Sequence, residues 1–225
     1  MPVPKTLDQH FFKTWMPEMA YVLGYFAADG SMLKNSRGAH FIEFTSVDRI
    51  LIEQVQNAAQ SNHRVAVRTR RGNDQIAYRL QLGSKEWYSD LTKLGFVQNK
   101  SKTLCFPNVP QEFVGDFVRG SFDGDGCAYF KQHWSHWHKK RVWVFTTRFT
   151  SGCEPFLVAL RALLGGYGIS GGYLNRKKRG GLDLVFSRND SLALYRLMYH
   201  TASASDLYLP RKRHKLETAI RELDL

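Results

Sequence analysis

The sequence predicts an α+β fold made of two similar halves, each with the order helix, two strands, helix, two strands, helix. Two observations indicate this fold. An apolar segment with a central glycine and an Asp-Gly end occurs twice, at 20–30 and 116–126. The hydrophobic periodicity that follows the second copy repeats the order that follows the first. With 225 residues, 43% of them hydrophobic, the chain is long enough to bury the core of both halves.

The first half is predicted from residue periodicity. After the first motif come two short strand-like stretches and then an amphipathic helical stretch. In the next hairpin, apolar and basic side chains alternate, so one face is expected to be core and the other basic. A last helix ends at Gly95, where glycine suits a left-handed cap. The expected elements are helices at 20–30, 47–60 and 84–94 and strands at 31–34, 40–46, 64–70 and 75–82.

The second half repeats this order after the second motif. Its first hairpin is longer and carries the sequence HWSHWHKKR at 133–141. Pro107 and Pro110 mark a linker, so we expect an N-terminal half at 1–100, a linker at 101–111 and a C-terminal half at 112–225. The expected elements are helices at 116–126, 152–164, 189–199 and 207–225 and strands near 127–131, 141–149, 172–177 and 182–186.

Charge and composition narrow the class of protein. The 32 Lys and Arg residues outnumber 20 Asp and Glu, giving a net charge of +12, and the basic residues form four dense patches. Such patches are typical of a track for a long polyanion. The longest apolar stretch, 20–28, is too short to span a membrane, and the N-terminus lacks the apolar run of a signal peptide. We therefore expect an intracellular protein that is not secreted, with three cysteines that form no disulfide framework.

The two Asp-Gly motifs predict a metal site. Each motif helix has small residues one turn apart, so the two helices can pack backbone to backbone. Asp29 and Asp125, 96 residues apart in the chain, would then lie at adjacent helix C-termini, where the helix dipoles are also negative. Such an arrangement needs cations, and carboxylate and carbonyl oxygens suit hard divalent ions. The small residues are Gly24, Ala28, Gly120 and Gly124.

The motifs VLGYFAADG at 22–30 and VRGSFDGDG at 118–126 resemble the two signatures of a single-chain LAGLIDADG homing endonuclease. The αββαββα order of both halves resembles that family as well. Tyr25 and Ser121 depart from the family pattern, but the final acidic residue is kept in both copies. The resemblance implies a DNA-binding saddle of two four-stranded antiparallel sheets, with the motif helices at the interface between the halves. It also implies site-specific hydrolysis of both DNA strands across the minor groove, leaving 3′ overhangs.

For the chemistry, the resemblance implies that Asp29 and Asp125 bind Mg²⁺, in sites that Mn²⁺ or Ca²⁺ can also occupy. The backbone carbonyls of Ala28 and Gly124 would complete these sites. The family also tends to place a basic residue near each scissile phosphate. By position in each half, the candidates are Lys100, with Lys102 as an alternative, and Lys212.

For DNA recognition, the resemblance implies that the basic sheet faces contact the major groove, where Arg pairs with guanine and Gln or Asn with adenine. The longer hairpin would contact the DNA backbone through Lys139 and Lys140. Its histidines have spacings that a zinc site could use, but the neighbouring Trp and Lys residues favour a tip that contacts DNA or solvent. The expected contacts are Arg64, Arg68, Arg70, Gln75, Arg79 and Gln81 in one half-site and Tyr173, Asn175, Arg176 and Lys177 in the other.

Three classes of function compete. The first is a monomeric endonuclease that acts on a long asymmetric target in double-stranded DNA. The second is a binding-only relative that cuts nothing, such as an intron RNA maturase, for which RNA is the partner. The third is a basic regulator that uses Asp-Gly turns structurally. Both aspartates and the duplicated pattern favour the first.

Overall fold

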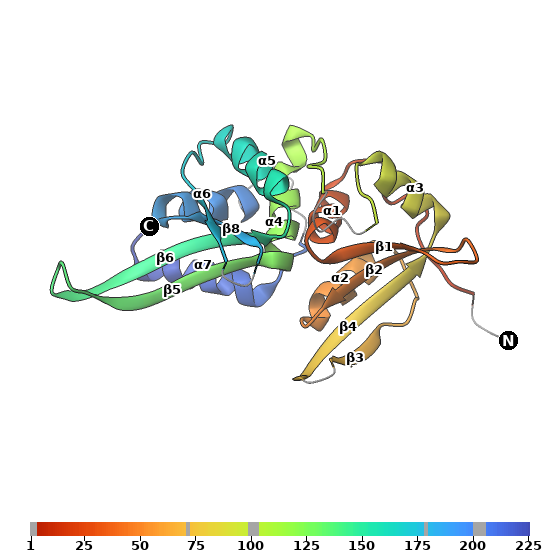
Figure 1. The fold of residues 1–225 in the computed structure, drawn as a ribbon, viewed down its shortest axis with the longest axis horizontal. Helices are drawn as coiled ribbons and strands as arrows, with labels where there is room; N and C mark the ends of the chain where they lie inside the picture. The colour runs from red at the N-terminus through yellow and green to blue at the C-terminus, as the bar shows by residue number, and fades with distance from the viewer. Residues whose placement is uncertain (1–3, 71–72, 99–103, 178–179, 200–205) are drawn as a thin grey trace.

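The computed structural model describes residues 4–70, 73–98, 104–177, 180–199 and 206–225. It has two four-stranded antiparallel sheets with the strand orders β1-β2-β4-β3 and β5-β6-β8-β7. The two sheets belong to separate halves that meet at helices α1 and α4 (Figure 1). The α+β fold and its repeated element order are therefore confirmed.

The first half follows the expected order closely. Its third helix begins after Ser84, whose hydroxyl accepts a hydrogen bond from the backbone N–H of Trp87, and ends before Gly95 at φ 92°. The left-handed glycine predicted at this helix end is confirmed. The elements are α1 (Pro17–Asp29), β1 (Gly30–Lys34), β2 (His40–Ser46), α2 (Arg49–Ala58), β3 (Ala66–Arg70), β4 (Asn73–Gly83) and α3 (Lys85–Lys93).

The second half differs mainly in its first hairpin. Strands β5 and β6 pair continuously from Gly126 with Phe149 to Ser135 with Lys140, so most of the expected loop at 133–141 is strand. Aromatic residues in β5, and aromatic and β-branched residues in β6, favour a ladder that continues to a short turn. The elements are η2 (Gln111–Phe113), α4 (Val114–Asp125), β5 (Gly126–Ser135), β6 (Lys140–Ser151), α5 (Glu154–Gly165), β7 (Tyr173–Arg176), β8 (Leu182–Phe186), α6 (Arg188–Tyr199) and α7 (Pro210–Glu222).

Helices α1 and α4 form the interface between the halves. Each is buried on nearly all sides, as expected for a helix that is packed between two cores. A Cβ added at Gly24 would lie 2.0 Å from the carbonyl oxygen of Phe117, and one added at Gly120 would lie 2.0 Å from that of Tyr21. The two helices therefore touch backbone to backbone at two equivalent points.

The join between each motif helix and its strand also requires glycine. Gly30 has φ −83° and Gly126 has φ −80°, so neither residue is a left-handed turn. A Cβ at Gly30 would lie 2.0 Å from the ring of Phe26, and one at Gly126 would lie 2.4 Å from Phe122. The Asp-Gly pair thus lets the strand leave the helix directly, with the aspartate as the last helical residue.

Each sheet has one face against helices and one polar face. In the first sheet Phe44 and Leu80 pair and are both buried, while their neighbours Glu43 and Gln81 pair on the opposite face. In the second sheet Phe149 and Leu184 hold the equivalent buried positions. Among the described residues, no helix is long and apolar enough to span a membrane.

Candidate active site

Asp29 and Asp125 end the two packed motif helices. Asp29 is half-buried and Asp125 is exposed. A Cβ added at Gly124 would lie 2.5 Å from the Cβ of Ala28 and 3.4 Å from Oδ2 of Asp29. The carboxylate of Asp29 therefore lies beside the C-terminal end of the other half's helix, where backbone carbonyls carry partial negative charge.

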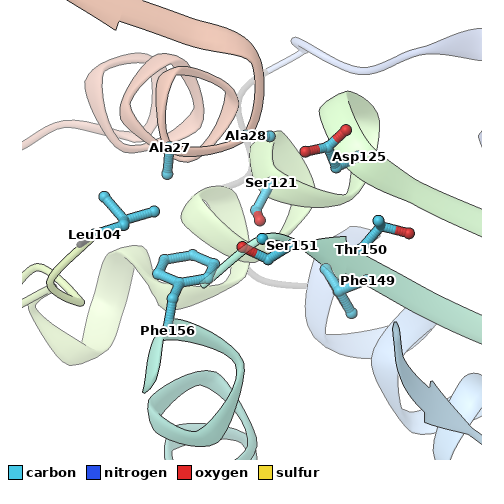
Figure 2. Close-up of a pocket in the computed structure, with 10 residues that line it drawn as sticks. Ala27, Ala28, Leu104, Ser121, Asp125, Phe149, Thr150, Ser151 and Phe156 are labelled. Carbon is cyan, nitrogen blue, oxygen red and sulfur yellow. The ribbon is translucent and has the colours of Figure 1, made fainter. Parts of the chain in front are cut away.

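Two pockets open beside this helix pair, and each combines parts of both halves. The first is lined by Asp125 together with Ala27 and Ala28 from the end of α1 (Figure 2). The second is lined by Asp29 together with Asp123 and Gly124 from the end of α4. The predicted residues are thus brought together crosswise, since each aspartate faces the end of the partner helix.

This donor set suits a hard divalent cation that also contacts a substrate. Within the described ranges, no group of three or more His, Cys, Asp or Glu side chains could hold a metal, and this includes the histidines of the long hairpin. Each pocket offers the terminal aspartate of one motif helix and the end of the other helix, with its backbone carbonyl oxygens. The Asp29 pocket is also lined by Asp48, which pairs with Arg211, and by Asp123, which accepts hydrogen bonds from Tyr21 and Leu209. Mg²⁺ commonly binds proteins through one or two carboxylates and completes its shell with water and phosphate oxygens. The residues present therefore fit such an ion.

Lys212 lies at the site, but its ammonium group is turned to the helix end. The residue is 6% exposed, and its Nζ donates hydrogen bonds to the carbonyl oxygens of Phe122, Asp123 and Gly124 at 2.7, 2.8 and 2.9 Å. Burial lowers the pKa of Lys212 to about 8, although the negative charge of Asp123 opposes this shift. Lys100 and Lys102 lie outside the described residues.

Asp123, which has no acidic equivalent in the first motif, connects three helices. Its Oδ2 accepts hydrogen bonds from the hydroxyl of Tyr21 on α1 at 2.8 Å and from the backbone N–H of Leu209 before α7 at 2.7 Å. Burial raises the pKa of Asp123 to about 6, and these hydrogen bonds and the charge of Lys212 limit the rise. No sequence pattern predicted this role, because the contacts join residues 86 and 102 positions apart.

Arg211 is a basic residue of the second pocket that sequence reasoning missed as a site residue. Its guanidinium forms a bidentate ion pair with Asp48 of the other half, through Nε at 2.8 Å and Nη2 at 2.5 Å. Arg68, a predicted DNA contact, lines the same pocket from β3. The sequence signals were that Arg211 belongs to one of the four dense basic patches and that it precedes the candidate Lys212.

On the predicted basic face of the first sheet, the acidic residue Glu43 binds two of the predicted DNA contacts. Arg79 pairs with Glu43 at 2.8 Å, and the amide of Gln81 donates to the same carboxylate at 2.6 Å. Arg64 is exposed just before β3. Arg70 lies in β3 and Gln75 in β4, and the structure describes only the backbone of these two residues.

On the second sheet, Tyr173 and Asn175 are exposed on the polar face, since Asn175 pairs with Asp183. Arg176 differs from these two residues in orientation, and its contact with DNA stays a prediction. Side chains alternate along a strand, so Arg176 points to the helix side and forms an ion pair with Glu154 at 2.7 Å. Lys177 lies on the polar face again, and its Nζ is 2.9 Å from Oδ1 of Asp183.

The equivalent ion pairs of the two sheets have opposite polarity. By register, Glu43 corresponds to Arg148 and Arg79 to Asp183. Nη1 of Arg148 lies 3.7 Å from Oδ2 of Asp183. This ion pair occupies the position in the second sheet that the Arg79–Glu43 pair occupies in the first. Arg148 is thus a cation of the polar face that the sequence pattern did not single out.

Asp183 is expected to make stability depend on pH. Burial raises the pKa of Asp183, but hydrogen bonds from Thr150 and Lys177 outweigh burial and hold the pKa below its usual value. The stability it contributes is therefore present above the unfolded pKa and lost as pH falls through the folded one. Asp183→Asn should cost about 1 to 2 kcal/mol at pH 7, and this difference should shrink toward pH 3. Urea unfolding across this range measures it; a difference that stays constant with pH would contradict this account.

The turn of the long hairpin is exposed. Lys139 adopts φ 48°, and Lys139, Lys140 and Trp137 are exposed, Trp137 at 90%. The ring of His133 contacts the hydroxyl of Tyr129 on its own strand. The hairpin thus presents cationic and aromatic groups away from both cores.

The paired helices, their terminal aspartates and the two sheets define a LAGLIDADG-type fold. Residues 16–93 match the family model of the LAGLIDADG-like domain. The chain therefore contains a LAGLIDADG-like domain in its first half, and the resemblance seen in the sequence is confirmed. A search of curated proteins found no significant match.

Solved structures extend the similarity to both halves. The LAGLIDADG meganuclease I-AabMI bound to uncleaved DNA is 13% identical, with a TM-score of 0.64 over 93% of this chain and 91% of that one. I-SmaMI bound to an uncleaved DNA target with calcium ions is 14% identical, with a TM-score of 0.60 over 94% and 92%. I-SmaMI bound to cleaved DNA is 13% identical, with a TM-score of 0.60 over 94% and 91%. Over nearly its whole length, the chain has the fold of these meganucleases.

Proposed function

We propose that this protein is a site-specific homing endonuclease that makes a double-strand break in a long DNA target. The observation that carries the proposal is the crosswise pairing of Asp29 with Gly124 and of Asp125 with Ala28 in two pockets beside one helix pair. Two hydrolytic centres related by a pseudo-twofold axis match the two antiparallel strands of a DNA duplex, because each centre can cut one strand. Similarly folded meganucleases bound to uncleaved and to cleaved DNA support this function.

Each centre would hold one divalent cation, with Mg²⁺ as the proposed ion. Asp29 and the carbonyl of Gly124 would hold one ion, and Asp125 and the carbonyl of Ala28 the other. Such an ion supplies an activated water and stabilises the leaving oxygen of a phosphodiester. A solved I-SmaMI complex with calcium ions and uncleaved DNA supports the use of a divalent ion.

The protein's own residues would bind and orient the DNA. The net charge of +12 favours the phosphate backbone and makes affinity depend on salt. Arg68 and Arg211 line the Asp29 pocket and can contact phosphates close to the bond that is cut. Residues of the polar sheet faces, such as Gln81 and Asn175, would read base edges. Because one chain supplies both halves, a monomer is sufficient.

A cleavage and binding assay on a randomised duplex library tests this function. With Mg²⁺ we expect double-strand cuts at one long site, identified by sequencing the ends. With Ca²⁺ in its place, or with Asp29→Asn and Asp125→Asn combined, we expect binding to the same site without cuts.

The assay also separates the competing functions. Specific binding without cuts under any condition would overturn the endonuclease proposal in favour of a binding-only protein, and intron RNA splicing would be assayed next. Absence of specific DNA binding would overturn the saddle as a DNA-binding surface.

A further inference from the structure

Lys212 makes an unusual set of contacts for a lysine beside a nucleic-acid site. Its ammonium group donates three hydrogen bonds to backbone carbonyls at the end of α4, and it lies 5.5 Å from the centre of the Phe122 ring. Lys212 does not line the pocket that contains Asp29, whereas its neighbour Arg211 does. Its ammonium group is therefore directed at the protein backbone and not at the space that DNA would enter.

The beginning of α7 is held in place from both halves. Arg211 is bound to Asp48 of the first half, and the backbone N–H of Leu209 is bound to Asp123 of α4. These contacts fix the position from which Lys212 reaches α4. An ammonium group bonded to the last carbonyls of a helix holds those carbonyls in one orientation.

One of the three carbonyls belongs to the candidate metal site. Gly124 lines the Asp29 pocket, and its Cα lies next to the Asp29 carboxylate. A carbonyl oxygen has two lone pairs, so the Gly124 oxygen can accept from Lys212 and still coordinate an ion. We propose that Lys212 is a positioning residue that orients the Gly124 carbonyl for the ion at Asp29, and so serves one of the two centres. This inference rests on the proposed function and refines it.

The proposal predicts an effect on one centre only. Lys212→Met removes the ammonium group, and Lys215→Met makes the same change at an exposed site on the same helix. Lys212→Gln keeps two N–H donors and should recover part of the loss. We expect Lys212→Met to weaken binding of one of two Ca²⁺ ions to the protein–DNA complex at least 10-fold by calorimetry. Cleavage with Mg²⁺ should slow at least 10-fold on the strand that Asp29→Asn affects, and Lys215→Met should match the natural protein.

Other outcomes separate the possible failures. Equal slowing of both strands, or slow cleavage with unchanged Ca²⁺ binding, would overturn the positioning role in favour of a direct contact with DNA. If Lys212→Met does not fold, Lys212→Gln takes its place in the test. Its partial loss of Ca²⁺ binding and of cleavage rate must then affect one ion and one DNA strand. A loss that affects both ions or both strands overturns the proposal. If Asp29→Asn and Asp125→Asn impair cleavage but Lys212→Met does not, only this inference fails. If neither aspartate matters, the proposed function fails as well.

Discussion

Asp29→Asn and Asp125→Asn should each convert the protein into an enzyme that nicks one strand, and the two variants should nick opposite strands. Each substitution removes the charge of the aspartate that ends one motif helix, and leaves the terminal aspartate of the other helix in its own pocket. Metal stabilisation of a transition state amounts to several kcal/mol, so cleavage of the affected strand should slow about 1000-fold. Asn has the shape of Asp, so folding and DNA binding should persist.

A duplex labelled differently on its two strands measures this directly, with a supercoiled plasmid as a second substrate on which nicked circles accumulate. Asp224→Asn is a suitable control, because Asp224 is exposed and its φ of 51° is tolerated by Asn. If either variant loses both cuts to the same extent, the two aspartates act in one shared centre, and the crosswise two-pocket arrangement is wrong.

Gly24→Ala and Gly120→Ala should each destabilise the protein by about 3 kcal/mol or more. The added methyl carbon would sit 2.0 Å from a backbone oxygen of the facing helix, of Phe117 or of Tyr21. Because the collision is with backbone, no side-chain rotation relieves it, and the two helices must separate. The free-energy cost of this separation is expected at or above the upper end of the range for overpacked cores. The free energy of unfolding from urea titration measures the effect.

Gly165→Ala provides the matched control for this interface. Gly165 is also helical, and an added Cβ there meets no atom within 4 Å. That change should be neutral or stabilise by about 0.5 kcal/mol, because alanine restricts the unfolded chain. Equal effects at Gly24 and Gly165 would mean that the helices tolerate wider spacing than their contacts indicate.

The sequence was informative where a pattern is local or repeated. The duplicated motif gave the order of elements, the small residues of the helix interface and the position of both aspartates. The orientation of Arg176 was not predictable from the basic run alone, because side chains alternate between the two sides of a strand. The roles of Asp123 and Lys212 were not predictable, since they depend on α7 returning to α4 from a distant part of the chain.

The opposite polarity of the two sheets' ion pairs bears on how this molecule can change during evolution. In an assembly of two identical chains, any substitution on the sheet appears in both halves at once. Here Arg79 and Asp183 occupy equivalent places with opposite charge, which no identical pair of subunits could present. Because both halves lie in one chain, each surface can vary alone. Under the proposed function, the two ends of a DNA target can therefore diverge independently, while the helix interface stays constrained by its glycines.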